Sequence, residues 1–200
     1  MKKVLGSFFG AITSWPMIIV VAVLVIGVRF GVAQSVKVDG LSMMPNYQDK
    51  QALTVDTLDR NIQRGQVVAV YKNKELSLHS NVLTRFSGAE FLLKRVIGLP
   101  NEEIEIRGSE ITIYNSQHPD GFILEEKYIP VETKRVAELN QSKIDRQKIP
   151  QDSYYVMGDN RNNSLDSRYY GAFPSSAILG LEKTFENNNY KAKIPVYNTK

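Results

Sequence analysis

The stretch EEIEIRGSEITIYN, residues 102–115, decides the fold class of this chain. Ile104 and Ile106 alternate with acidic residues, Gly108 follows, and two further isoleucines alternate with polar residues on the return. Strict alternation is typical of a strand with one buried face, because successive side chains of a strand point to opposite sides. Two such runs joined by a short glycine-containing turn predict a β-hairpin.

Four other short segments have a β-like character and are separated by turn residues. They are SVKVDG (35–40), QVVAVY (66–71), FLLKRVIGL (91–99) and SYYVMGDN (153–160). Only VETKRVAELNQSKI, residues 131–144, has a helical pattern. We therefore predict that the part of the chain after its long apolar run is mainly β.

That apolar run predicts a membrane anchor. Residues 4–28 contain no charged side chain, and a helix needs roughly 20 apolar residues to cross a bilayer. We expect an uncleaved transmembrane helix at residues 15–33. Lys2 and Lys3 predict a cytoplasmic N-terminus, with the remainder outside the cytoplasm. The alternative is a cleavable signal peptide, because Gly-Val-Ala at 31–33 has small residues, but the apolar region of a signal peptide is usually about 7 to 15 residues long.

The distribution of apolar residues also divides the chain into segments. Residues 115–149 have few apolar clusters, and we interpret them as a small cap inserted into a β-core. The predicted organisation is an N-terminal segment at 1–14, the anchor at 15–33, a β-core at 34–114 and 150–186, the cap at 115–149 and a polar tail at 187–200.

Composition and charge exclude several function classes. The net charge is +4, and the basic residues are scattered among nearly as many acidic ones. No basic tract with interleaved aromatic residues is present, so nucleic acid is not an expected partner. The chain contains no cysteine, which rules out disulfides and thiolate metal sites.

Histidine and metal chemistry find little support. His118 precedes Pro119 in an apparent surface turn, and His79 has no carboxylate nearby in the sequence. A His-based triad can be assembled from distant positions, but we interpret both histidines as surface residues. The stretch DNRNNSLD, which begins at Asp159, resembles a calcium loop only superficially, because Arg161 occupies a ligand position.

Ser42, in DGLSMMPN at residues 39–46, is a candidate nucleophile that needs a base. A free lysine titrates near 10.4 and becomes a useful base only when burial lowers its pKa. Lys94 lies within an apolar strand-like run, and the alternation places it on the face of Leu92 and Val96. The other interpretation of Lys94 is a solvated lysine on a strand edge.

A third segment favours the catalytic interpretation. GDNRNNSLDSRYYG, residues 158–171, follows a predicted strand and is dense in Asp, Asn and Ser. These side chains can bond to nearby backbone and fix an irregular loop. Their density suggests a rigid support for a neighbouring group.

Taken together, the blocks GLSMMP, KRVIGLP and GDNRNNSLDSRYYG resemble the type I signal peptidases (peptidase family S26), in that family's order. These are membrane-anchored Ser/Lys endopeptidases that release exported proteins. The short anchor and small cap resemble the single-span Gram-positive type. The resemblance implies the mainly β fold that signal peptidases share with LexA-like repressors, preceded by one transmembrane helix.

The resemblance also implies roles for the matching residues. Ser42 corresponds to the nucleophile, with its backbone N–H as one oxyanion donor, and Lys94 corresponds to the general base. Ser164 would orient the Lys94 amine through a hydrogen bond. Asp159 would pair with Arg95.

Asp166 and Arg168 would form an ion pair that braces the loop, and no metal or cofactor is implied.

The chain departs from the family pattern at three places. Gly40 stands where Gram-negative relatives have a serine that donates to the oxyanion, Asn46 replaces a threonine, and LPNEE at 99–103 replaces the usual LPGD.

The function implied by the resemblance is removal of N-terminal signal peptides from exported preproteins, after small residues of the Ala-X-Ala kind. The implied partners are these preproteins, the lipid bilayer and the secretion translocase, at the cell membrane.

Two alternative functions stay open. One is a self-cleaving repressor-type Ser/Lys peptidase, which would carry a DNA-binding domain instead of an apolar run. The other is a specialised or weakly active homologue that acts in pilus or surface-protein assembly.

Overall fold

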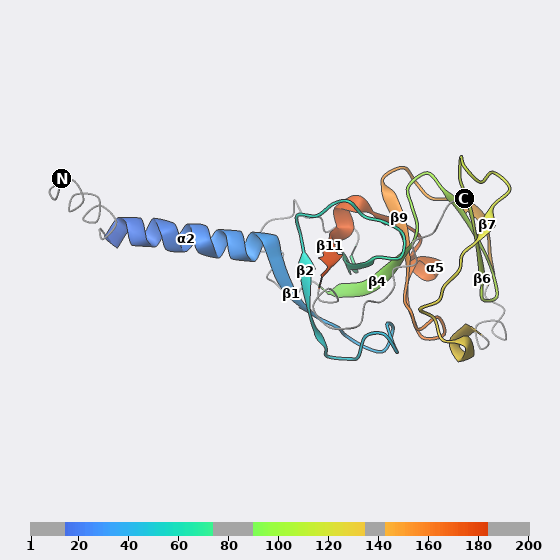
Figure 1. Cartoon of the computed structure of the whole chain (residues 1–200), viewed down its shortest axis with the longest axis horizontal. Coiled ribbons are helices and arrows are strands. Elements are labelled where there is room, and N and C mark those ends of the chain that lie inside the picture. The colour runs from blue at the N-terminus through green and yellow to red at the C-terminus, as the bar shows by residue number, and fades with distance from the viewer. Residues whose placement is uncertain (1–14, 74–89, 135–142, 184–200) are drawn as a thin grey trace.

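The computed structural model describes residues 15–73, 90–134 and 143–183 of the chain (Figure 1). His79, the N-terminal segment at 1–14 and the tail at 187–200 lie outside the described residues.

Eleven strands of the described residues form two antiparallel sheets, which confirms the prediction of a mainly β chain. The larger sheet has the strand order β1-β2-β11-β3-β4-β9-β10. Its strands are β1 (Ala33–Lys37), β2 (Ala52–Asp56), β3 (Val67–Tyr71), β4 (Phe91–Gly98), β9 (Ser153–Met157), β10 (Phe173–Pro174) and β11 (Ile178–Glu182). A 3-10 turn, η1 (Ser175–Ala177), and a short helix, α5 (Ser167–Tyr170), lie between its last strands.

The smaller sheet is built on the predicted hairpin. Its order is β7-β6-β5-β8, and its strands are β5 (Glu103–Arg107), β6 (Glu110–Tyr114), β7 (Phe122–Ile123) and β8 (Lys143–Lys148). Ile104 pairs with Ile113 and Ile106 with Ile111, and all four side chains are buried. Alternation thus placed the apolar face of this hairpin correctly.

Two strands of the smaller sheet, β7 and β8, come from the segment predicted as a cap. β8 pairs with β5, so the helix predicted for residues 131–144 is wrong at its C-terminal end. Residues 131–134 are helical and 135–142 lie outside the described residues. The physical reason for the error is the partner strand, since pairing with β5 imposes an extended backbone on a polar sequence.

Strand β4 holds the two sheets together. It lies between β3 and β9 in the larger sheet, and the chain continues from it through a turn into β5 of the smaller sheet. Residues 93–98 are all buried. At its end, a Cβ on Gly98 would lie 2.2 Å from Ile149 Cδ1, so a larger residue at this position would have to displace the Ile149 side chain.

Helix α2 (Trp15–Val32) precedes β1 and extends away from both sheets, whereas β6 and β7 lie at the opposite end of the molecule (Figure 1). Between Trp15 and Leu24 its large apolar side chains are exposed. Among the helices of the described residues, none meets the length and hydropathy needed to cross a membrane. The spanning anchor predicted at 15–33 is therefore not shown.

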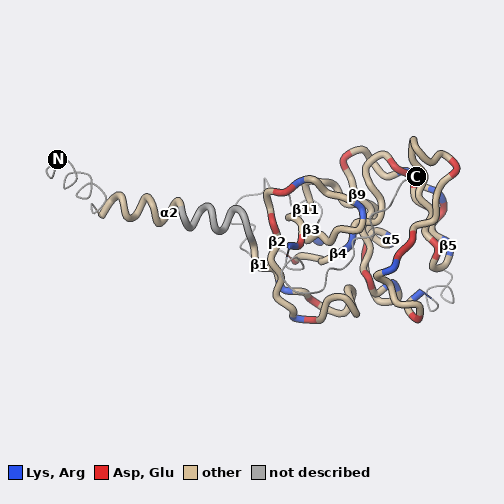
Figure 2. The backbone as a smooth tube through the Cα atoms, viewed as in Figure 1, with Lys and Arg blue, Asp and Glu red and all other residues tan. Residues whose placement is uncertain are grey.

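Acidic and basic residues are interspersed along the strands and loops of the two sheets (Figure 2).

Candidate active site

Ser42 lies in a turn between β1 and β2 and is half-buried. The turn is closed by hydrogen bonds from Met44 N to Leu41 O and from Tyr47 N to Met43 O. Met43 and Tyr47 are buried in an apolar cluster with residues of β2, β3 and β4. Burial of these two side chains fixes the turn against the sheet and leaves Ser42 facing β4.

The backbone of this turn also meets the loop after β9. Asn160 N donates to Ser42 O at 2.9 Å, and Asn160 Nδ2 donates to Leu41 O at 3.1 Å. A Cβ on Gly158 would lie 2.4 Å from Ser42 O and 2.3 Å from Ser164 Oγ. Only glycine permits so close an approach, so Gly158 determines how near the loop comes to Ser42.

Lys94 occupies the middle of β4, opposite Val68 of β3, and only 1% of it is exposed. Its Nζ lies 2.8 Å from Ser42 Oγ and donates to Leu93 O at 2.9 Å. The structure therefore brings the predicted nucleophile and the predicted base together. Of the two interpretations left open for Lys94, the solvated lysine on a strand edge is excluded by its burial.

Burial also changes the charge state of Lys94. It lowers the pKa of the amine from 10.5 to about 8, because the ammonium form loses its hydration. The nearby carboxylates of Asp166 and Asp159 oppose this change and Arg168 supports it. A base with a pKa near the working pH is suited to proton transfer.

Asp159 and Arg95, which the resemblance pairs, form a buried bidentate ion pair. Arg95 Nε lies 2.8 Å from Asp159 Oδ1 and Nη2 lies 2.6 Å from Oδ2, with exposed fractions of 3% and 0% for the two side chains. Arg95 Nη1 also donates to Gly65 O at 2.7 Å. The arginine that follows the lysine in β4 is thereby fixed to the loop after β9.

Asp166 and Arg168 form the second ion pair, at 2.9 Å and 2.8 Å. Asp166 also caps α5 and accepts from Gly158 N at 3.0 Å. Burial alone would raise the pKa of Asp166. Arg168 and the Gly158 N–H lower it by more than burial raises it, so the pKa lies below its ordinary value. Asp166 is thus a fixed negative charge beside the loop.

Ser164 is not joined to Lys94 by a hydrogen bond. Its Oγ is buried, and the hydroxyl acts on Asp166 instead, where it helps to lower the pKa of that carboxyl. It does lie beside Gly158, which contacts the Ser42 backbone. The orienting role that the resemblance implies for Ser164 therefore stays a prediction.

Sequence reasoning missed a third buried ion pair. Both terminal nitrogens of Arg161 donate to the carboxylate of Glu126, and both side chains are buried. Tyr128 donates to the same carboxylate, and its ring covers the Arg95 guanidinium with 4.1 Å between the guanidinium carbon and the ring centroid. The segment before residue 130 is therefore tied to the loop after β9, although no local sequence signal links them.

His118 lies in a turn, as predicted, but is half-buried rather than exposed. Its ring packs edge-on against Phe122 with 5.0 Å between the ring centroids. This packing keeps it in the smaller sheet, and no hydrogen bond connects it to Ser42 in the described residues.

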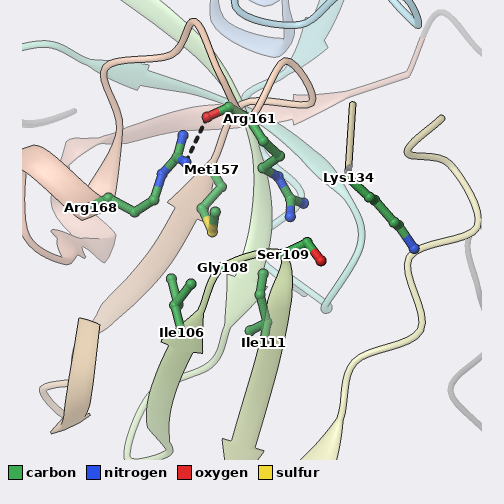
Figure 3. A pocket seen from close by; sticks show the side chains of 8 residues that line it. All are labelled: Ile106, Gly108, Ser109, Ile111, Lys134, Met157, Arg161 and Arg168. Carbon is green, nitrogen blue, oxygen red and sulfur yellow. Dashed lines mark hydrogen bonds between the residues drawn. The ribbon is translucent and has the colours of Figure 1, made fainter. Parts of the chain in front are cut away.

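A small pocket lies between the β5–β6 turn and the loop after β9 (Figure 3). Arg161 and Arg168 line it, and Arg168 donates to Arg161 O at 2.7 Å. Both guanidinium groups are already paired with carboxylates, and neither Ser42 nor Lys94 lines the pocket. It is therefore separate from the Ser42–Lys94 site.

Comparisons with known proteins identify the family of this chain. Residues 12–185 match the family described as signal peptidase, peptidase S26. The chain is 33% identical over 165 residues to a signal peptidase I of Leptolyngbya laminosa, covering 79% of this chain and 70% of that protein. It is 28% identical over 166 residues to signal peptidase I V of Bacillus subtilis strain 168, covering 82% and 91%.

Among solved structures, a signal peptidase I from Enterococcus faecalis V583 is similar, with 26% identity and a TM-score of 0.43, covering 60% of this chain and 96% of that one. On the family match and the Leptolyngbya relative, this chain belongs to the signal peptidase family, peptidase S26, and is a hydrolase of the signal peptidase I class.

Proposed function

We propose that this chain is a membrane-bound serine endopeptidase that removes signal peptides from exported preproteins with Ser42 and Lys94 as a catalytic dyad. The observation that carries the proposal is the 2.8 Å contact between Lys94 Nζ and Ser42 Oγ on a buried strand. A lysine that loses its proton near pH 8 is able to accept one from a serine hydroxyl.

The reaction begins when neutral Lys94 accepts the Ser42 Oγ proton and Oγ attacks the scissile carbonyl. The resulting lysinium gives that proton to the leaving amine, which departs as the C–N bond breaks. A water activated by Lys94 then hydrolyses the ester on Ser42 and restores the hydroxyl. Lys94 therefore accepts one proton and gives one back in each half of the reaction, from Ser42 to the leaving amine and then from water to Ser42 Oγ.

The developing oxyanion needs a preorganised donor. Ser42 N–H donates no hydrogen bond within the described residues, so it is available for this role. Gly40 cannot supply a second donor from a side chain, and its φ of +80° favours glycine at this position. The Ser42 backbone N–H is therefore the oxyanion donor that we propose, without a side-chain donor from Gly40.

The substrate is expected to bind as an added strand beside β4. On the side of β9, strand pairing reaches β4 only from Arg95 onward, and no described strand pairs there with Phe91–Leu93. An extended segment before the cleavage site could form main-chain hydrogen bonds at this stretch, next to Lys94. Following the family resemblance, we propose cleavage after small residues of the Ala-X-Ala kind.

Membrane attachment is proposed from α2 and the sequence before it. Trp15, Ile18 and Leu24 are exposed on a helix that extends away from the sheets, and exposed apolar surface of this kind favours a lipid environment. We propose one membrane pass with the N-terminus in the cytoplasm and the β-domain outside, near the translocase. Attachment would keep enzyme and preprotein in one plane and raise their effective concentration.

The proposal predicts a defined product. Purified full-length chain in detergent, mixed with a preprotein that has alanines at the first and third positions before the cut, should release the mature protein with one new N-terminus. Mass spectrometry of both fragments measures the cut. Ser42→Ala is the matched control, because it removes one oxygen and should yield no fragments.

An inert wild-type chain, or a Ser42→Ala variant that cuts at the same bond, would overturn the proposed function. Membrane attachment is tested separately by floating the wild-type chain and the Ser42→Ala variant with liposomes in a density gradient. A wild-type chain that stays at the bottom of the gradient contradicts the proposed attachment.

A further inference from the structure

Asn46 lies in the same turn as Ser42, and both of its contacts reach other parts of the molecule. Its Nδ2 donates to Asp159 Oδ2 at 2.7 Å and to Tyr128 O at 3.0 Å. Asp159 is 113 positions away in the sequence and Tyr128 is 82 positions away. One amide group therefore connects the turn that carries the nucleophile to two distant segments.

The contact with Asp159 leads directly to the base. Asp159 Oδ2 accepts from Arg95 Nη2 as well as from Asn46. Arg95 follows Lys94 in β4, so movement of the Arg95–Asp159 pair relative to the turn would change how the Lys94 amine meets Ser42 Oγ. The path from nucleophile to base thus runs through Asn46, Asp159 and Arg95, in addition to the direct 2.8 Å contact.

The contact with Tyr128 holds the other side of the same ion pair. The Tyr128 ring lies over the Arg95 guanidinium, and its hydroxyl donates to Glu126, the partner of Arg161. Asn46 thereby joins the turn to the segment that covers Arg95. Both hydrogens of an amide nitrogen can serve as donors at once, whereas a hydroxyl has only one hydrogen to donate.

We propose that Asn46 is a positioning residue for the reaction at Ser42, because its amide sets the position of the nucleophile turn relative to the strand that carries Lys94. This inference rests on the Ser42–Lys94 dyad of the proposed function. It assigns the role to the amide group itself: a single hydroxyl at this position can satisfy either Asp159 or Tyr128, and an alanine can satisfy neither.

The expected effect is on kcat. Asn46→Ala should lower kcat about ten- to a hundredfold, because a small misplacement of reacting groups costs up to about a hundredfold in rate. KM should stay within about threefold, since the Asn46 amide donates to Tyr128 and Asp159 and not to the stretch of β4 where the substrate is proposed to bind. Asn46→Thr, which keeps one donor, should give an intermediate kcat. Steady-state cleavage of the preprotein measures both constants.

Asn162→Ala is the matched control. The Asn162 amide also donates to a backbone carbonyl, that of Thr133 at 3.2 Å, but Asn162 is exposed and Thr133 is not part of the Asn46–Asp159–Arg95 path. All variants are assayed at a temperature where circular dichroism shows them fully folded. Asn162→Ala should then retain wild-type kcat.

The inference is overturned if Asn46→Ala keeps the kcat of Asn162→Ala, or if its loss lies entirely in KM. Wild type and Ser42→Ala are assayed alongside. An inert wild type, or an active Ser42→Ala, overturns the proposed function and this inference with it, whereas an active wild type with an inert Ser42→Ala and an unchanged Asn46→Ala overturns the inference alone.

Discussion

Replacing Lys94 by methionine is expected to abolish cleavage while making the folded chain more stable at neutral pH. Methionine has a similar length but no proton acceptor at the position of Nζ. Loss of a group that acts as a unit with the nucleophile typically lowers kcat by a factor of about a thousand or more. Cleavage of the preprotein, followed by gel densitometry over a long time course, measures this loss.

The gain in stability follows from the pKa of Lys94. In the unfolded chain the amine titrates at its ordinary 10.5, whereas burial lowers its pKa in the folded chain to about 8. Below pH 8 both states carry the proton, so the folded state bears the whole penalty, about 3 kcal/mol for a difference of this size. Between pH 8 and 10.5 the unfolded state binds more protons, and stability rises with pH.

Methionine removes this penalty but also removes the hydrogen bonds to Leu93 O and Ser42 Oγ. We therefore expect Lys94→Met to raise the free energy of unfolding by about 1 to 3 kcal/mol at pH 7. The difference from wild type should shrink as the pH approaches 10.5. Urea unfolding at both pH values measures it, and a variant that is less stable at pH 7, or that still cleaves, contradicts the assignment of Lys94 as a buried base.

Replacing Asp159 by alanine is expected to give the largest loss of stability. The change leaves the guanidinium of Arg95 buried without its carboxylate and removes an acceptor of Asn46. Breaking a buried ion pair by removing one partner typically costs about 3 to 5 kcal/mol. Chemical denaturation monitored by fluorescence of the tyrosines and the tryptophan measures the change.

Asp39→Ala provides the matched comparison for Asp159→Ala. Asp39 also pairs with a basic side chain, Lys50, but both are exposed, and exposed pairs contribute little. Its midpoint of unfolding should lie close to that of wild type. If the two aspartate variants unfold at the same denaturant concentration, the buried Arg95–Asp159 pair does not stabilise the fold as described.

The hairpin of β5 and β6 could be predicted from sequence because its evidence is local. The alternation of apolar and polar residues predicts which side chains are buried, namely Ile104, Ile106, Ile111 and Ile113. β8 could not, since KIDRQK has little apolar periodicity and becomes a strand only through its partner β5. The prediction at residues 143–144 failed where a long-range partner overrode a local pattern.

In the candidate site, too, local patterns could be predicted from the sequence and long-range contacts could not. An apolar neighbourhood identified Lys94, but its burial depends on β3 and on the turn that carries Ser42, and both contacts are long-range. The polar loop at 158–171 indicated rigidity without indicating which atoms meet. Nothing local relates Arg161 to Glu126, which are 35 positions apart. Asn46 drew attention only as a departure from the family pattern, and its contacts with Asp159 and Tyr128 required the fold.

The pH dependence of kcat/KM tests most directly whether Lys94 is the base for Ser42. Activity requires the neutral amine, so kcat/KM should rise about tenfold per pH unit on the acidic side and level off above a midpoint of about 8. A variant lacking both His79 and His118 should give the same curve. A midpoint near 6.5, the ordinary value for histidine, that disappears in the double histidine variant would contradict the Ser42–Lys94 dyad.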